Sequence, residues 1–175
     1  MSALSVIVAV PPTTDAERPL AFACAETAAR RLGAVAVASA WPRGGLFALE
    51  PDGRSVALSI THTTVLVAAI ASSEGPVGID AEAWTREARA VDRILAPGER
   101  APLEQAANAA GFPAALAMWC AKEAVGKALG RGLTNASQWR LAPSSETAVW
   151  RLDGTPELAV RLIRFRDTLL AIAIP

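Results

Sequence analysis

The chain is divided near its middle by a run of turn-forming residues, Ser72-Ser73-Glu74-Gly75-Pro76, between two apolar segments. Serine, glycine and proline clustered in this way predict a boundary between two folded units. The pattern on each side of the boundary is similar: a strand, then helical residues, then further strands. This order predicts an α+β fold of two related lobes, residues 1–75 and 76–175, which together form one compact domain.

Hydrophobic periodicity and the positions of glycine and proline predict the individual elements. In the first lobe we expect a helix at 21–32 and strands at 4–10, 35–40, 55–60 and 64–71, the last two joined by a turn at 61–63. In the second lobe we expect a strand at 77–81 and helical structure from 85 to 129, interrupted at Pro97-Gly98, Gly111 and Pro113. Strands at 147–152, 158–164 and 169–174 complete that lobe, with a turn at Asp153-Gly154.

Composition excludes several classes of partner. The 175 residues are 52% hydrophobic, which is enough for a sizeable core, and the formal net charge is zero. No overall field therefore attracts nucleic acid or an anionic membrane, and any anionic ligand must be held by local charges. The first residues lack a signal-peptide pattern, and the apolar run at 65–71 is too short to span a bilayer. Cys24 and Cys120 are isolated, so we expect two buried free thiols in a soluble, cytoplasmic protein.

Two carboxylates close together on the strand that begins the second lobe are the first sign of chemistry. Asp80 and Glu82 are two residues apart, so their side chains project from the same face of a strand. Neighbouring carboxylates repel each other unless a cation or a proton intervenes, and Mg²⁺ prefers oxygen ligands of this kind. The alternative is an ordinary solvent-exposed strand end.

The segment Trp119-Cys120-Ala121-Lys122-Glu123-Ala124-Val125-Gly126-Lys127 adds a second cluster, on a helix. Glu123 and Lys127 are four residues apart and lie on one side of it, away from the apolar stripe formed by Met118, Ala121, Val125 and Leu129. The alternative is a surface ion pair that stabilises the helix by about 0.2–0.5 kcal/mol. Together with the acidic strand, however, Glu123 could complete an oxygen-ligand magnesium site, and the neighbouring lysines could hold phosphates that the metal bridges.

These segments resemble the paired signature of the 4′-phosphopantetheinyl transferase superfamily. The sequence GIDAE at 78–82 is similar to that family's first motif, and WCAKEAVGK at 119–127 is similar to its second. Three further segments resemble family elements: SITHT at 59–63, LAPGER at 95–100 and LGRGL at 129–133. The likeness is good from 59 to 133 and loose on either side. Chain length and the two-lobed pattern resemble the monomeric branch of the family, known for activating surfactin synthetase, more than the short trimeric synthases.

The resemblance implies an activity and a metal centre. The family moves the phosphopantetheine arm of coenzyme A onto a serine of an apo acyl or peptidyl carrier protein, with Mg²⁺ and coenzyme A bound between pseudo-twofold α+β lobes. Asp80, Glu82 and Glu123 match its metal-binding acids, and Glu123 also matches the proposed general base. Lys127 matches the lysine that contacts the pyrophosphate. These residue types suit a reaction in which the serine loses its proton and negative charge on phosphate must be neutralised.

The resemblance also implies contacts for the rest of coenzyme A. Thr61 and His62 match coenzyme A contacts, and Lys122 is expected to add positive charge beside the phosphates. The alternative for His62, the single histidine in the chain, is a hydrogen-bonded turn residue.

The chain departs from the family pattern in its first lobe. Only residues 11–19 separate the first strand from the first helix, and the lysines that commonly hold the 3′-phosphate have no clear counterpart. The G-(K/R)-P segment that is usual in the family is not clearly matched, and the nearest candidates are residues 43–45 and 52–54. The cations that could substitute, or could equally be solvated surface charges, are Arg30, Arg31, Arg43 and Arg54.

Two other functions remain open at this point. One is a catalytically degenerate module that binds coenzyme A or a carrier protein without transferring anything. The other is an unrelated Mg²⁺-dependent phosphoesterase that uses the same carboxylates. The sequence does not indicate which carrier protein or biosynthetic pathway, whether of fatty acids, polyketides or nonribosomal peptides, is served.

Overall fold

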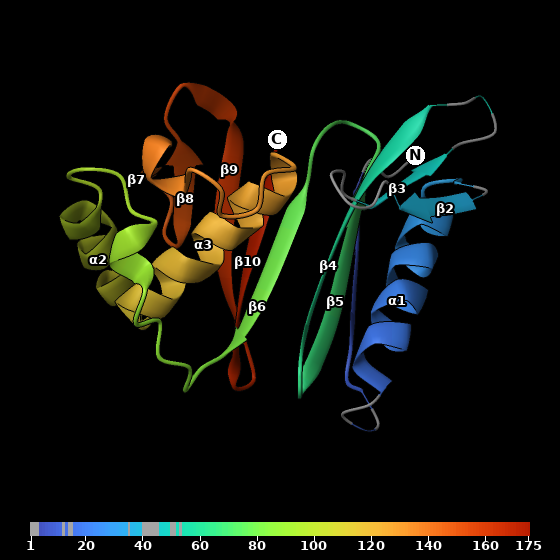
Figure 1. Cartoon of the computed structure of the whole chain (residues 1–175), viewed down its shortest axis with the longest axis horizontal. Coiled ribbons are helices and arrows are strands. Elements are labelled where there is room, and N and C mark those ends of the chain that lie inside the picture. Colours follow the sequence, from blue (N-terminus) through green and yellow to red (C-terminus); the bar gives the residue numbers. More distant parts are fainter. Residues whose placement is uncertain are drawn as a thin grey trace.

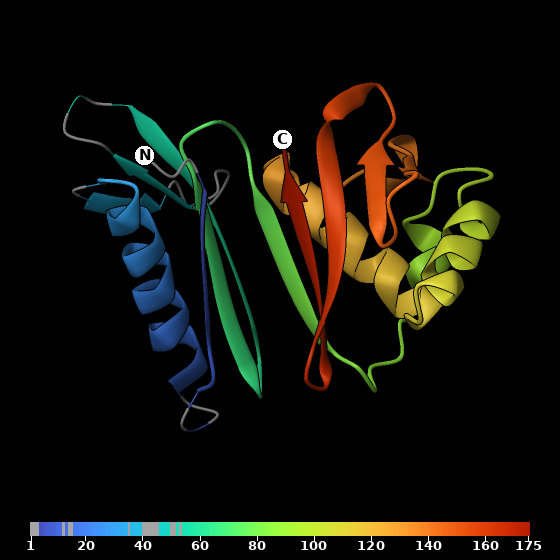
Figure 2. The same ribbon diagram turned by 180° about the vertical axis from the view of Figure 1, so that it is seen from behind.

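The computed structural model describes residues 4–11, 13, 16–34, 36–39, 46–49, 52 and 54–175. Within them the chain forms two five-stranded antiparallel sheets that face each other, with helices on the outer sides (Figure 1). Figure 2 shows the same layers from behind. The prediction of a mixed α+β fold is confirmed, and the two sheets meet on either side of the predicted boundary at 72–76.

The first sheet is built entirely from the first half of the chain. Its strands are β1 (Leu4–Ala9), β2 (Ala36–Ser39), β3 (Leu46–Leu49), β4 (Ser55–Thr63) and β5 (Leu66–Ser72), in the order β1-β5-β4-β3-β2. Helix α1 (Glu17–Arg31) covers its outer face (Figure 1). The helix presents buried alanines such as Ala21 and Ala25 to Val67 and Ala69 of β5, and such small side chains allow a close approach.

The second sheet is built from the second half. Its strands are β6 (Gly78–Ala83), β7 (Leu141–Pro143), β8 (Val149–Leu152), β9 (Thr155–Phe165) and β10 (Thr168–Ile174), in the order β6-β10-β9-β8-β7. Helix α3 (Ala114–Ala128) packs on β6, β10 and β9, and α2 (Arg100–Ala109) packs on α3. Short 3₁₀ turns occur at Val91–Arg93 and Ala136–Gln138. In each sheet the strand that comes first in the chain pairs with the one that comes last.

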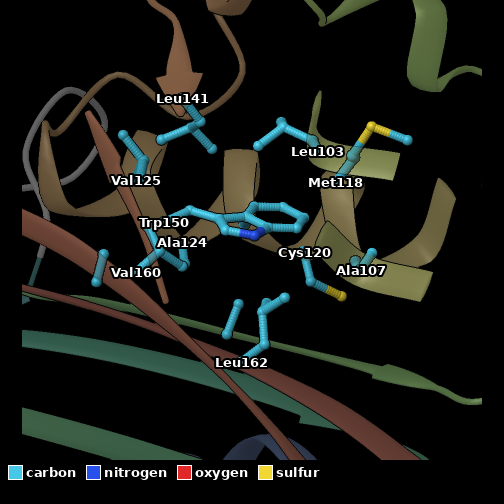
Figure 3. Close-up of a cluster of buried hydrophobic side chains, with 14 of the residues drawn as sticks. Leu103, Ala107, Met118, Cys120, Ala124, Val125, Leu141, Trp150, Val160 and Leu162 are labelled. Atoms are coloured by element: carbon cyan, nitrogen blue, oxygen red, sulfur yellow. The ribbon is translucent and has the colours of Figure 1, made fainter. Parts of the chain in front are cut away.

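The main core lies between the second sheet and its helices. The Trp150 side chain is buried at its centre, among Leu103, Met118, Leu141 and Leu162 (Figure 3). A buried tryptophan contributes a large apolar area, so this core anchors α3 firmly on the sheet. The orientation of α3 fixes where its polar side chains point.

The two sheets are joined along β6 and β4. Strand β6 is an edge strand of its own sheet, so alternate backbone N–H groups have no partner within that sheet. Hydroxyl groups of β4 accept these hydrogen bonds: Ile79 N–H donates to Ser59 Oγ at 3.1 Å, and Ala81 N–H donates to Thr61 Oγ1 at 3.0 Å. An apolar cluster that includes Ile70 of β5, Ile79 of β6 and Leu170 of β10 continues the seam.

The structure corrects several expected boundaries. Residues 61–63 belong to β4, and the turn lies at 64–65, because Thr61 and His62 pair with Ala68 and Val67 of β5. Strands β3 and β7, of four and three residues, were not predicted. The expected helical structure at 85–99 is turns and the 3₁₀ turn at Val91–Arg93, and α-helix begins only at Arg100.

Other expectations are confirmed or lie partly outside the described residues. Helix α1 begins at Glu17, before the expected start at 21. Pro19 is tolerated in the first turn, because the N–H group that proline lacks would have no hydrogen-bond partner within the helix at that position. The strand expected at 35–40 is seen as Ala36–Ser39, and its two end residues lie outside the described part. Asp153-Gly154 forms the expected turn, and both cysteines are buried and free. No helix among the described residues is long and apolar enough to cross a membrane.

Candidate functional site

The candidate site lies where α3 meets the seam between β6 and β4, and its centre is an ion pair between Asp80 and Lys127. Asp80 of β6 is 6% exposed, and the Lys127 Nζ atom lies 2.8 Å from its Oδ1 atom. The same ammonium group donates to the carbonyl oxygen of Ile79 at 2.9 Å and to that of Ile60 at 3.4 Å. Lys127 therefore connects a helix with one strand from each sheet, so both halves of the chain contribute to the site.

Two glycines allow the backbones to approach closely enough for this contact. A Cβ atom added to Gly78 would lie 1.8 Å from the carbonyl oxygen of Ala124, so only glycine lets α3 rest directly on β6. A Cβ atom added to Gly126 would lie 2.0 Å from the carbonyl oxygen of Gly132, where the chain folds back over the end of the helix. The glycines of both motifs thus have a packing role, which places Asp80 within reach of α3.

Glu123 lies one helical turn before Lys127, in the same electrostatic environment. Burial raises the pKa of the Glu123 carboxyl above its ordinary value, and the negative charge of Asp80 raises it further. The positive charges of Lys127 and Arg86 oppose these two effects. Burial, together with Asp80, also raises the pKa of Cys120 well above the usual range, so that thiol is protonated at neutral pH. Glu123 is therefore a carboxylate with enhanced affinity for a proton or another cation.

The third predicted acid, Glu82, is engaged elsewhere. Its carboxylate forms an ion pair with the guanidinium of Arg86, and the side chain of Glu82 is only 14% exposed. Arg86 also lies over the ring of Trp119, 5.5 Å from its centroid, in a cation–π contact. Glu82, Arg86 and Trp119 thus form a connected group at the side of the site, toward the start of α3.

Whether these residues fit a divalent cation can be judged from the donor atoms. The Oδ2 atom of Asp80 is buried and has no hydrogen-bond partner among the described residues. A buried, unpartnered carboxylate oxygen is costly unless something binds it, and the negative charge of Asp80 also raises the pKa of Glu123. The chemistry of this pair fits a hard cation such as Mg²⁺. No group of three metal-ligating side chains is gathered in the described residues, and Glu82 is paired with Arg86.

Thr61 and His62 both lie on β4, next to the site, but in different environments. The Thr61 hydroxyl is buried, 3.5 Å from Asp80 Oδ1, and accepts the hydrogen bond from Ala81. His62 is more exposed, and its Nδ1 atom lies 3.1 Å from Oε2 of Glu17 at the start of α1. Strand geometry turns these neighbouring side chains to opposite faces, so Thr61 supports Asp80 while His62 faces α1.

The expectation that Lys122 stands beside phosphates disagrees with its position. Its side chain is fully buried, and its Nζ atom lies 2.9 Å from Oε2 of Glu99. The same ammonium group donates to the carbonyl oxygens of Ala136 at 3.0 Å and Trp139 at 2.5 Å. Glu99 also accepts hydrogen bonds from the N–H groups of Ala96 and Leu141, both at 2.6 Å. Lys122 therefore ties α3 to the loops behind it, on the side away from Asp80.

Arg86 and Glu99 were not singled out in the sequence. Arg86 lies four residues after Glu82 but outside any helix, so no periodicity signals the pair. Glu99 belongs to the P-x-E-R segment noted at 97–100, which marks the residue but not its buried partner on α3. Only the fold shows which charges meet.

Four arginines were candidates for binding the 3′-phosphate of coenzyme A. Two of them form ion pairs with other residues, and one lies outside the described residues. Arg30 pairs with Glu26 at 2.6 Å, and Arg54 pairs with Asp52 at 2.7 Å, all on exposed surface. Arg31 is exposed at the end of α1. Arg43 and the segment at 43–45 lie outside the described residues, as does Gly53 of the alternative segment.

Comparison with known proteins identifies a family whose matched region includes the central residues of this site. The family profile described as "4′-phosphopantetheinyl transferase superfamily" matches residues 76–171, more than half of the 175-residue chain. The match spans β6, helices α2 and α3 and most of the second sheet, and so includes Asp80, Glu123 and Lys127. No curated protein matches the chain. The family in general transfers phosphopantetheine from coenzyme A to carrier proteins, generally with Mg²⁺. This chain belongs to the 4′-phosphopantetheinyl transferase superfamily.

Proposed function

We propose that the protein transfers the 4′-phosphopantetheine group of coenzyme A to a serine of an apo-carrier protein and releases 3′,5′-ADP. The observation that carries this proposal is the Asp80–Lys127 pair at 2.8 Å beside Glu123, within the matched family region. A buried acid with an unpartnered oxygen, a second acid of raised pKa and a partly exposed lysine provide cation binding, proton acceptance and phosphate binding in one place.

Asp80 and Glu123 would hold the Mg²⁺ ion, which, when bound, neutralises negative charge on the pyrophosphate of coenzyme A. Lys127 orients the pyrophosphate and offsets its charge through an ammonium group that already bridges both halves of the site. Glu123 would accept the proton of the carrier serine, the role proposed for the matching acid of the family. The serine oxygen then forms a bond to the β-phosphorus as the bond to the departing 3′,5′-ADP breaks.

Three finer features belong to the same proposal. We infer that the two halves are pseudo-symmetric lobes of the monomeric, surfactin-synthetase-activating type, and the identical order of strands in the two sheets supports this. We infer that coenzyme A binds along the seam of β4 and β6 beside Thr61, while His62, which faces α1, would contact it from the other face of β4. The protein would act as a monomer in the cytoplasm, on a carrier protein.

The test is to incubate the pure protein with coenzyme A, Mg²⁺ and a panel of apo-carrier proteins, and to measure the intact mass of each carrier. The expected result is the addition of one phosphopantetheine group to at least one carrier. Binding of coenzyme A without transfer to any carrier would instead indicate a binding module. Release of 3′,5′-ADP from coenzyme A without a carrier would indicate a phosphoesterase.

A further inference from the structure

The Glu82–Arg86 ion pair raises a question about the composition of the metal site. Glu82 lies on the same strand face as Asp80, two residues away, which is where a third oxygen ligand would come from. Its carboxylate nevertheless pairs with Arg86, and no three metal-ligating side chains converge in the part of the chain that the structure describes.

Arg86 is held in place by more than this one contact. Its guanidinium lies over the Trp119 ring at 5.5 Å, and Trp119 is on α3, one turn before Glu123. A cation–π contact and an ion pair made by the same planar group restrict its orientation. The arginine therefore stays beside Glu82 because the position of α3 keeps it there.

We propose that Arg86 withholds Glu82 from the metal site of this protein, so that Asp80 and Glu123 hold the divalent cation without it. Arg86 is a positioning residue in this view: it directs a carboxylate and adds a positive charge close to the place where a cation would bind. This inference rests on the proposed function, since it concerns the same metal site.

The proposal predicts the sign of three effects on metal affinity. Arg86→Gln should increase affinity about threefold to tenfold, because Glu82, once released from its ion pair, supplies a further anionic oxygen to the cation. Glu82→Gln in the otherwise unchanged protein should alter affinity by less than about twofold, since Glu82 is not a ligand there. The double variant Arg86→Gln, Glu82→Gln should lose the gain, which shows that the gain acts through Glu82.

A matched control is available in the same segment. Arg89 pairs with Glu87 at 2.6 Å on exposed surface and, like Arg86, lines the small pocket beside Trp119. Arg89→Gln changes the net charge by the same amount as Arg86→Gln but leaves Glu82 paired. It should therefore leave metal affinity unchanged within about twofold.

The measurement is titration of the full chain with Mn²⁺, with the free ion followed by electron paramagnetic resonance, both without and with saturating coenzyme A. Circular dichroism and thermal denaturation establish that each variant is folded. Asp80→Asn serves as the reference for the site itself and should weaken Mn²⁺ binding at least tenfold. If Arg86→Gln weakens binding, or Glu82→Gln alone weakens it tenfold, Glu82 is a ligand that Arg86 supports, and the proposal is wrong. If Asp80→Asn leaves Mn²⁺ binding unchanged, the proposed metal site itself fails.

Discussion

The ammonium group of Lys127 on α3 lies 2.8 Å from the carboxylate of Asp80 on β6, and it also reaches the backbone of β4. This contact joins the two halves of the chain at the point where both family motifs meet. We expect Lys127→Ala to weaken coenzyme A binding about 10–150-fold, the equivalent of the 1.5–3 kcal/mol typical of a hydrogen bond to a charged group. Turnover should also fall, since the lysine contacts phosphate in the ground state and the transition state.

Binding of coenzyme A by isothermal titration and steady-state kinetics on one apo-carrier would measure both effects. A change in thermal stability alone, with unchanged binding and turnover, would mean that Lys127 only joins the two sheets.

Asp80→Asn should reduce transfer at least 10²-fold while the protein remains folded. The substitution keeps the shape of the side chain and an oxygen for Lys127 and Thr61, but removes the charge that a divalent cation needs. Intact-mass measurement of the carrier gives the rate, and circular dichroism gives the fold. Excess chelator should abolish transfer by the wild-type protein, and full activity under that condition would rule out a metal requirement.

Glu123→Gln should separate catalysis from stability. We expect turnover to fall at least 10²-fold, as for the loss of a general base. The melting temperature of the metal-free protein should instead rise at pH 7–8. Because the folded protein raises the pKa of Glu123, this carboxyl favours the folded state below its unfolded pKa, and that contribution is lost as the pH rises through the folded pKa.

The gain in melting temperature should therefore shrink as the pH is lowered through the raised pKa of wild-type Glu123, because the carboxyl group then takes up a proton in the folded protein. Thermal denaturation of both proteins in chelator, across this pH range, tests the sign. A gain that is constant with pH would exclude the charge of Glu123 as its cause.

Lys122→Met should destabilise the protein by about 3–5 kcal/mol, because it leaves Glu99 as an unpaired buried charge. Adding Glu99→Gln removes that charge, so the double variant should cost less than the sum of the two single changes. Urea denaturation provides these values. If the Lys122→Met protein instead has normal stability and binds coenzyme A poorly, Lys122 contacts the phosphates of coenzyme A, as the sequence suggested.

Removal of the 3′-phosphate from the donor should cost this protein little. Among the candidate cations in the described residues, Arg30 and Arg54 are paired with Glu26 and Asp52, and no lysine cluster precedes the first helix. We expect dephospho-coenzyme A to lower kcat/KM by less than about sixfold, or about 1 kcal/mol. Kinetics with both donors on one apo-carrier decide the matter. A loss of a hundredfold or more would show a rebuilt pocket, which single substitutions of Arg30, Arg31, Arg43 and Arg54 would locate.

Local sequence determined the residue types of the site and the class of fold. The shared face of Asp80 and Glu82 and the helix that carries Glu123 and Lys127 follow from periodicity within a single strand or helix. The break at 72–76 follows from clustered turn-forming residues. Each family motif is a contiguous segment for the same reason, because one strand or one helix carries all of its residues.

Only the tertiary structure decided which of these charges meet. Lys122 and Lys127 belong to one helix, yet the packing of α3 directs Lys122 into the core toward Glu99 and Lys127 into the seam toward Asp80. Glu82 was expected at the metal, but Arg86 and Trp119 converge on it from outside the motif. The partner of a charged side chain depends on how strands and helices pack, and residues such as Asp80 and Lys127, 47 positions apart, carry no local signal of their contact.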